Sequence, residues 1–152
     1  MTDATTTALQ LVDGTTYYAT VQACDRQGRC TEVSSDGVIV DSTAPVAGNV
    51  NDGFGVFDAD YQVDNHVVSA SWNSFHDPHS PIVKYTWCVG MAPGQCDLQE
   101  HVSVGLNTRA LNTELQLSDA NGNAIGRVYV TVTEYNAAGL TVSQSVNTRA
   151  LR

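Results

Sequence analysis

Hydrophobic and polar residues alternate along most of this chain, in short runs that end at Gly, Pro, Asn or Asp about every ten residues. The clearest runs are TTYYATVQAC, HVVSASW, IVKYTWCVG and GRVYVTVTEY, which are rich in Val, Thr, Tyr and Trp. The turns DRQG, APGQ, DANGN and NAAG carry residues that tolerate a positive φ or preset a bend. Helical periodicity is nearly absent. The pattern therefore predicts an all-β fold of the sandwich type.

The pattern also repeats within the chain. The segment LQLVDGTTYYATVQACDRQGRC near the start returns as LQLSDANGNAIGRVYVTVTEYNAAGLT near the end. The matched pairs are Leu9 with Leu115, Leu11 with Leu117, Tyr18 with Tyr129, Val21 with Val132, Asp25 with Asn136, and Gly28 with Gly139. The two copies lie about 110 residues apart, which is the span of one domain. We therefore expect the chain to open in the last part of one repeat and to continue through a complete second repeat.

A joint between the two units is predicted at VDSTAPVAGNVNDG, where Pro45 with flanking Ser, Thr, Ala and Gly favours a short, stiff connection. The expected division is a partial unit over residues 1–42 and a complete unit over residues 43–152. In the partial unit, strands are expected at about residues 6–12, 16–25 and 29–41. Such a small sheet with one apolar face is rarely stable alone. Cover from the upstream part of the repeat or from another chain is therefore expected over Leu9, Leu11, Tyr17 and Val21.

Several of these segments resemble fibronectin type III domains. VVSASWNSFHDPHSPIVKYTW resembles the strand B tryptophan of that family, at Trp72, followed by its strand C tyrosine, at Tyr85. LVDGTTYYATVQACDRQG is similar to the strand F segment, which implies that Tyr17 is the tyrosine-corner residue. The resemblance implies a seven-stranded sandwich, preceded by strands E, F and G of another repeat. The joint resembles those of tandem arrays in large extracellular animal proteins.

The second unit departs from the family pattern at two positions. Val128 stands where the corner tyrosine is expected, so the corner hydrogen bond is not predicted there. Glu134 falls on the inward row of Val128, Val130 and Val132. An unpaired buried charge is costly, and we therefore expect Glu134 to lie at the rim of the sandwich.

Four cysteines allow three disulfide pairings. Under the resemblance, Cys24 and Cys30 face each other across the hairpin of strands F and G, while Cys88 ends strand C and Cys96 opens the next strand. Local disulfides 24–30 and 88–96 suit the short separation that such a bond needs. Redox C-x-x-C motifs and the closer spacing of zinc knuckles are both absent from the sequence. Stable disulfides indicate an oxidising compartment, although the N-terminus carries no signal peptide, so we expect a piece of a larger secreted protein.

The excess of acidic over basic residues disfavours negatively charged binding partners. Lys and Arg together number 7 against 16 Asp and Glu, for a net charge of -9, which disfavours nucleic acid and anionic lipid. No window approaches the roughly 18 apolar residues of a membrane span, so membrane insertion is not predicted. The expected partners are other domains of the same array or other protein chains, with strand complementation as one route.

The segment NDGFGVFDADYQVDN is a candidate calcium site because it gathers Asp52, Asp58, Asp60 and Asp64 near the joint. Calcium prefers oxygen ligands of this kind, with Asp58 and Asp60 as the first candidates. The spacing is not that of an EF-hand, and aspartates also populate loops that bind no metal. Both interpretations stay open. No other cofactor is predicted.

The segment FHDPHS is the one place where His, Asp and Ser crowd together. His76, Asp77 and Ser80 do not suit a catalytic triad, whose members converge from separate elements. A turn initiated by Asp77 and Pro78 is the favoured interpretation, with a weak metal contact by His76 or His79 as the alternative. With no catalytic constellation, the chain is not predicted to be an enzyme.

These observations predict a non-enzymatic structural and adhesive module of an extracellular or cell-surface multidomain protein or fibre. The module would act as a disulfide-braced spacer and protein-interaction unit. Two alternatives stay open: a recognition module that binds calcium or glycan, and an accessory domain of a larger secreted enzyme. Neither an RGD tripeptide nor an N-x-S/T sequon occurs in the sequence.

Overall fold

A computed structural model describes residues 2–54 and 64–148, which contain eleven strands and no helix. The strands are β1 (Thr16–Tyr17), β2 (Thr20–Cys24), β3 (Cys30–Ser34), β4 (Val38–Ile39), β5 (Asn49–Asp52), β6 (Val68–Asn73), β7 (Ile82–Gly90), β8 (Gln99–Gly105), β9 (Arg109–Asn112), β10 (Val128–Asn136) and β11 (Thr141–Thr148). The predicted all-β fold is confirmed. In the described part of the chain, no helix could cross a membrane.

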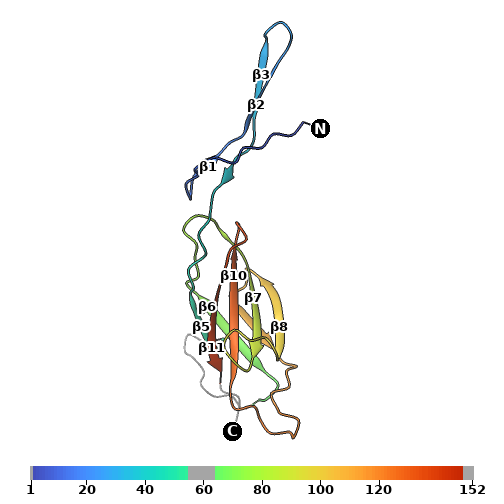
Figure 1. The fold of residues 1–152 in the computed structure, drawn as a ribbon. Helices are drawn as coiled ribbons and strands as arrows, with labels where there is room; N and C mark the ends of the chain where they lie inside the picture. The colour runs from blue at the N-terminus through green and yellow to red at the C-terminus, as the bar shows by residue number, and fades with distance from the viewer. Residues whose placement is uncertain (1, 55–63, 149–152) are drawn as a thin grey trace.

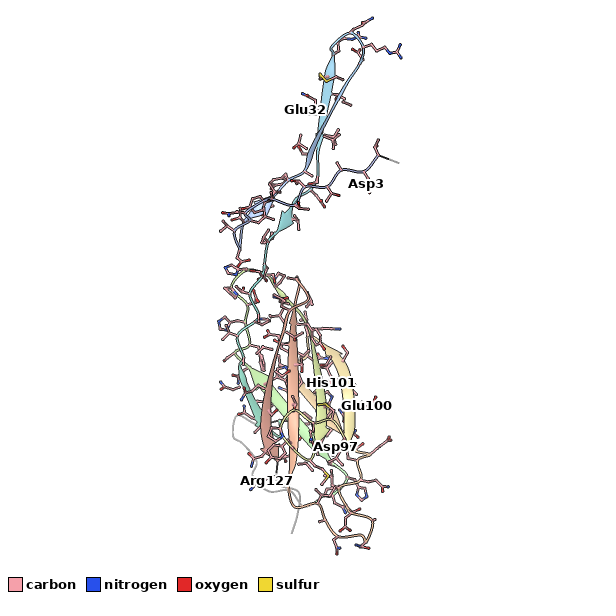
Figure 2. All side chains as sticks on the ribbon, viewed as in Figure 1. Asp3, Glu32, Asp97, Glu100, His101 and Arg127 are labelled. Atoms are coloured by element: carbon pink, nitrogen blue, oxygen red, sulfur yellow. A yellow bond between two sulfur atoms is a disulfide. The ribbon has the colours of Figure 1, made fainter. Side chains whose placement is uncertain are left out.

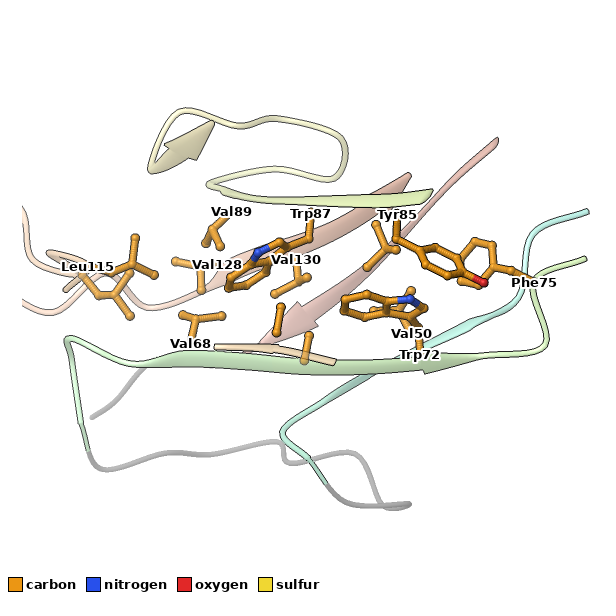
Figure 3. Packing of buried hydrophobic residues seen from close by; sticks show 14 residues of the cluster. Val50, Val68, Trp72, Phe75, Tyr85, Trp87, Val89, Leu115, Val128 and Val130 are labelled. Carbon is orange, nitrogen blue, oxygen red and sulfur yellow. The ribbon is translucent and has the colours of Figure 1, made fainter. Parts of the chain in front are cut away.

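The second unit is a β-sandwich built from two antiparallel sheets (Figure 1). One sheet has the order β5-β6-β9, and the other has the order β11-β10-β7-β8. Figure 3 shows the inward side chains of the two sheets meeting in one core. That core consists of Val50, Val68, Ala70, Trp72, Phe75, Tyr85, Trp87, Val89, Ala110, Leu115, Leu117, Val128, Val130 and Val132.

Alternation along the strands produces this core. On β10, the side chains of Val128, Val130 and Val132 are fully buried, because successive positions of a strand point to opposite faces. Trp72 on β6 and Tyr85 on β7 meet across the sandwich, with their ring centroids 5.8 Å apart and their planes tilted by 60°. Tilted aromatic pairs of this kind add to the free energy gained from burial alone.

The outer face of β10 is also covered. The disulfide Cys88–Cys96 ties the connection between β7 and β8 back onto this sheet. In that connection, the backbone N–H of Gly94 donates to the hydroxyl of Thr131 at 3.1 Å. Thr131 is therefore buried although it points away from the core. Thr133, whose hydroxyl lies 2.8 Å from that of Ser143, is buried on the same face. The middle of β10 is therefore buried on both faces.

The first unit is a narrow antiparallel ribbon that extends away from the sandwich (Figure 1). β1 pairs with β4, and β2 pairs with β3. Every residue of β2 and β3 is exposed. The disulfide Cys24–Cys30 closes the ribbon at the last pair of β2 and β3.

The predicted strands of this unit need three corrections. Residues 6–12 form no strand, since a strand needs a neighbour to bond and the described chain offers none there. The predicted strand 16–25 divides into β1 and β2, and 29–41 divides into β3 and β4. Gly37, with a φ of 94°, interrupts the second of these.

Candidate functional site at the joint between ribbon and sandwich

The joint between the two units is held by a cluster of polar side chains from three segments. Asp41 follows β4, Asp77 and Ser80 lie in the loop between β6 and β7, and Asn136 ends β10. We call these residues, together with Thr43, the joint cluster. Its members approach from positions far apart in the sequence, because the loop and the end of β10 meet at the edge of the sandwich nearest the ribbon (Figure 1).

Asp41 is the centre of the cluster, and its side chain is only 1% exposed. Its Oδ1 accepts hydrogen bonds from the backbone N–H and the hydroxyl of Thr43, at 3.0 and 2.9 Å. Its Oδ2 accepts from the hydroxyl of Ser80 and from Nδ2 of Asn136, the latter at 3.0 Å. Each carboxylate oxygen therefore has two donors, and these hydrogen bonds stabilise the charge.

Asn136 bridges the ribbon to the sandwich through its amide nitrogen. Besides Oδ2 of Asp41, Nδ2 has Oδ2 of Asp77 at 3.0 Å and the carbonyl oxygen of Thr43 at 3.3 Å, so its two hydrogens are shared among three acceptors. Its Oδ1 accepts from the backbone N–H of Leu140 at 2.8 Å, which fixes the turn between β10 and β11. The amide nitrogen of Asn136 thus binds the joint, while its amide oxygen binds the turn.

Hydrogen bonds determine the charge state of the two aspartates. The hydroxyl of Ser80 lowers the pKa of Asp41, and the groups of Thr43 lower it further, against the effects of burial and of Asp77. Burial raises the pKa of Asp77, but hydrogen bonds from the backbone N–H groups of Ser80 and His79, together with side-chain hydrogen bonds such as that of Asn136, bring it below its usual range. Both carboxyl groups are therefore ionised near neutral pH.

Two further contacts reinforce the joint. Asp13 in the ribbon accepts hydrogen bonds from the backbone N–H and the hydroxyl of Ser42, at 2.7 and 2.9 Å. Gly14 lies against His79 so closely that a Cβ at this position would be 3.0 Å from the imidazole Cδ2. The ribbon, the connecting segment and the sandwich are therefore in direct contact.

The donor atoms of Asp41, Asp77 and His79 lie within 4.8 Å of one another, a spacing that a metal ion could use. Nδ1 of His79 is 2.9 Å from the hydroxyl of Thr43. Oδ1 of Asp77 accepts from the backbone N–H groups of His79 and Ser80 at 2.8 and 2.9 Å. Because protein donors already satisfy these groups, the arrangement favours a hydrogen-bonded joint over a metal centre.

The residues of the predicted calcium segment are only partly described. Asp58 and Asp60 lie outside the described residues. Asp52 is buried at the end of β5, and Asp64 accepts a hydrogen bond from the backbone N–H of His66 at 2.8 Å. Calcium binding by this segment stays a prediction.

The predicted disulfides are both present, and the structure describes no free cysteine. Two details differ from expectation. Cys88 lies inside β7, which continues to Gly90, and Cys96 lies in the connection before β8 rather than at the start of that strand. Tyr17, the proposed corner residue, accepts a hydrogen bond on its phenol oxygen from the backbone N–H of Val12 at 3.0 Å.

The prediction that Glu134 lies at the rim is wrong, because its side chain is completely buried. Neither carboxylate oxygen has a hydrogen-bond partner among the residues that the structure describes. Glu134 stands opposite Tyr85 of β7. Burial raises the pKa of Glu134 to about 7, and the charge of Asp77 adds to this effect while His76 opposes it. Burial and the charge of Glu134 also raise the pKa of Tyr85.

A shallow groove of about 620 Å³ lies beside the disulfide of the sandwich. Among its lining residues are Asp97, Glu100 and His101 (Figure 2). Asp97 accepts from the backbone N–H of Met91 at 2.9 Å, and Nδ1 of His101 is 3.2 Å from the hydroxyl of Thr86. These side chains support the local fold, and the residues that line the groove include no nucleophile paired with a base.

No protein-family model matches the chain, and no curated protein matches it. What defines the molecule is therefore its own structure: a β-sandwich with an attached disulfide-closed ribbon and a hydrogen-bonded joint between them.

Proposed function

We propose that this chain is a structural and adhesive segment of an extracellular multidomain protein, in which it acts as a stiff spacer and a protein-interaction unit. The observation that carries the proposal is the joint cluster, in which Asn136 of the sandwich donates to Asp41 of the connecting segment. A flexible linker would leave the carboxylate of Asp41 in water, whereas here it is buried and accepts four hydrogen bonds. Ordered joints of this kind are what a spacer needs to keep its length and direction.

The proposed family is that of fibronectin type III domains. Support comes from the number and order of the strands, since the sandwich combines a sheet of three strands with a sheet of four. Trp72 and Tyr85 pack together in the core, as the resemblance implies. Two local disulfides support an extracellular location, because such bonds persist in oxidising compartments.

Replacement of Asn136 by Asp tests the spacer role sharply. Asn136→Asp keeps an oxygen that can accept from Leu140, but it removes the donor and places a third carboxylate beside Asp41 and Asp77. We expect the ribbon to swing away from the sandwich, so that small-angle X-ray scattering detects a broader distribution of dimensions. Hydrogen exchange over residues 41–45 should also accelerate.

Asn121→Asp is the matched control, because it adds the same charge at an exposed turn of the sandwich. The control should give the scattering curve of the unmodified chain. If Asn136→Asp also gives that curve, with unchanged exchange in the connecting segment, the joint is not held by this cluster and the proposal of a stiff spacer fails.

A further inference from the structure

The ribbon carries an apolar face that nothing covers in the described residues. Val21 on β2 pairs directly with Val33 on β3, so both side chains point to the same face, and they are 68% and 70% exposed. Figure 2 shows the side chains of this part of the ribbon far from the sandwich, with Glu32 as a marker. β2 has β3 as its single strand neighbour among the described residues, so its other edge offers unpaired backbone groups.

The second unit contains a completed version of the same hairpin. The five-residue segments 25–29 and 136–140 share the same backbone hydrogen bonds at the two hairpin turns. Each has a glycine at its fourth position, Gly28 with φ 80° and Gly139 with φ 86°. In this alignment Val21 corresponds to Val132, whose side chain is fully buried. Val21 is exposed where Val132 is buried, so the ribbon lacks a neighbouring element that covers this valine.

The element that covers the corresponding edge in the second unit is β7. It runs antiparallel to β10, with Trp87 opposite Val132 and Tyr85 opposite Glu134. These two aromatic residues alternate along β7 and fill the core above β10. The equivalent edge of the ribbon is β2, where Val21 and Ala23 occupy the positions of Val132 and Glu134.

We propose that the free edge of β2 binds an extended segment of a partner polypeptide, in antiparallel orientation, with large aromatic side chains at two alternate positions. One aromatic side chain would cover Val21, and the next would lie over the smaller Ala23. Backbone hydrogen bonds supply affinity in such strand addition, and the alternate side chains supply specificity. This inference rests on the proposed function and names the kind of partner that its interaction unit takes.

Two occupants taken from the described residues themselves fit less well. β7 of the same or of a second copy is already paired on both edges, with β10 and with β8. Association of two ribbons through β2 would bring together chains that each carry a net charge of -9, and it would set small valines against small valines. A neutral or basic partner with aromatic residues suits the edge better.

The test uses a fluorescent peptide with the sequence of residues 81–90, carrying Cys88→Ser, added to the full chain. We expect a saturable rise in fluorescence anisotropy and slower hydrogen exchange in β2. A peptide with Tyr85→Ser and Trp87→Ser should bind roughly tenfold more weakly or worse, because the aromatic anchors are gone. The chain variant Val21→Lys with Val33→Lys should lose binding to a similar extent.

Leu106→Lys is the matched control, because Leu106 is an exposed leucine of the sandwich and its replacement should leave binding unchanged. Disulfide mapping and the melting temperature of the sandwich establish that the ribbon variant is folded. The inference is overturned by no binding, by binding that survives in the ribbon variant, or by protection of the sandwich instead of β2 and β3. A doubled mass in light scattering, which shows a second copy on the edge, also overturns it. A negative result leaves the scattering test of the joint unaffected, so the two proposals fail separately.

Discussion

Replacement of Glu134 by Gln should stabilise the sandwich at neutral and alkaline pH. The carboxyl group is completely buried, and neither oxygen has a hydrogen-bond partner among the described residues. Burial raises the pKa of Glu134 from 4.5 to about 7. By linkage, this difference corresponds to about 3 kcal/mol of unfolding free energy, since each pKa unit is worth about 1.4 kcal/mol.

The sign of the effect follows from proton uptake. Below about pH 4.5 the carboxyl group is protonated in both the folded and the unfolded chain, so it causes no penalty there. Between about pH 4.5 and pH 7 the folded chain holds a proton that the unfolded chain has lost, and the free energy of unfolding falls as the pH rises. Above about pH 7 the full penalty is present. Asp41 and Asp77, whose pKa values are lowered, act below this window and in the opposite direction.

Urea unfolding of both chains at several values between about pH 4.5 and pH 8 measures the effect. The difference in unfolding free energy between Glu134→Gln and the unmodified chain should grow by about 3 kcal/mol across this range. Groups that do not interact with Glu134 cancel in that difference. Glu100→Gln, which removes the same charge at an exposed position of β8, is the matched control.

A pH-independent difference for Glu134→Gln would refute the reasoning. It would mean that the carboxyl group titrates alike in the folded and unfolded chains, and hence that water or a hydrogen-bond donor reaches it. A loss of stability for Glu134→Gln above about pH 7 would refute it more directly, because the charged carboxylate would then be favourable in the folded state.

Two further predictions concern the backbone and the disulfides. Gly48→Ala should destabilise the sandwich by about 3 kcal/mol in thermal or urea unfolding, because the new Cβ would lie 2.0 Å from the carbonyl oxygen of Asn73. Gly126→Ala, where a Cβ meets nothing within 4 Å, should change stability by less than about 0.5 kcal/mol. Mild reduction should open the exposed disulfide of the ribbon first, which mass spectrometry after alkylation detects, and should leave the melting temperature of the sandwich unchanged. Early loss of the sandwich disulfide, which includes a fully buried cysteine, would contradict this order.

Much of the fold could be predicted from the sequence, because alternation and turn residues are local signals. The four clearest strand segments all form strands, and the repeated turns carry glycine at the position of positive φ. The segment at residues 6–12 shows that local signals alone do not predict a strand correctly. Leu9 and Leu11 alternate as a strand would, yet a strand forms only against a neighbour.

The joint cluster could not be predicted because its contacts join distant parts of the chain. Asp41 and Asn136 are 95 residues apart, and neither residue stood out by its type or its local spacing. The predicted position of Glu134 at the rim is wrong for a related reason. Its position on the inward row was evident, but the sequence does not tell whether the end of that row is open to water or covered.

The turn between β10 and β11 has a counterpart between β2 and β3. Its first residue is Asn136, and the first residue of the counterpart is Asp25. In both turns an Oδ1 atom accepts the backbone N–H four residues later, from Arg29 to Asp25 and from Leu140 to Asn136. The other polar atom of each side chain makes a different contact. Oδ2 of Asp25 accepts from the guanidinium of Arg29, whereas Nδ2 of Asn136 donates to Asp41 in the connecting segment. An aspartate there could not donate to an acidic linker. The asparagine at the first position of this turn therefore links the hairpin of β10 and β11 to the connecting segment, which the aspartate of the ribbon turn could not do.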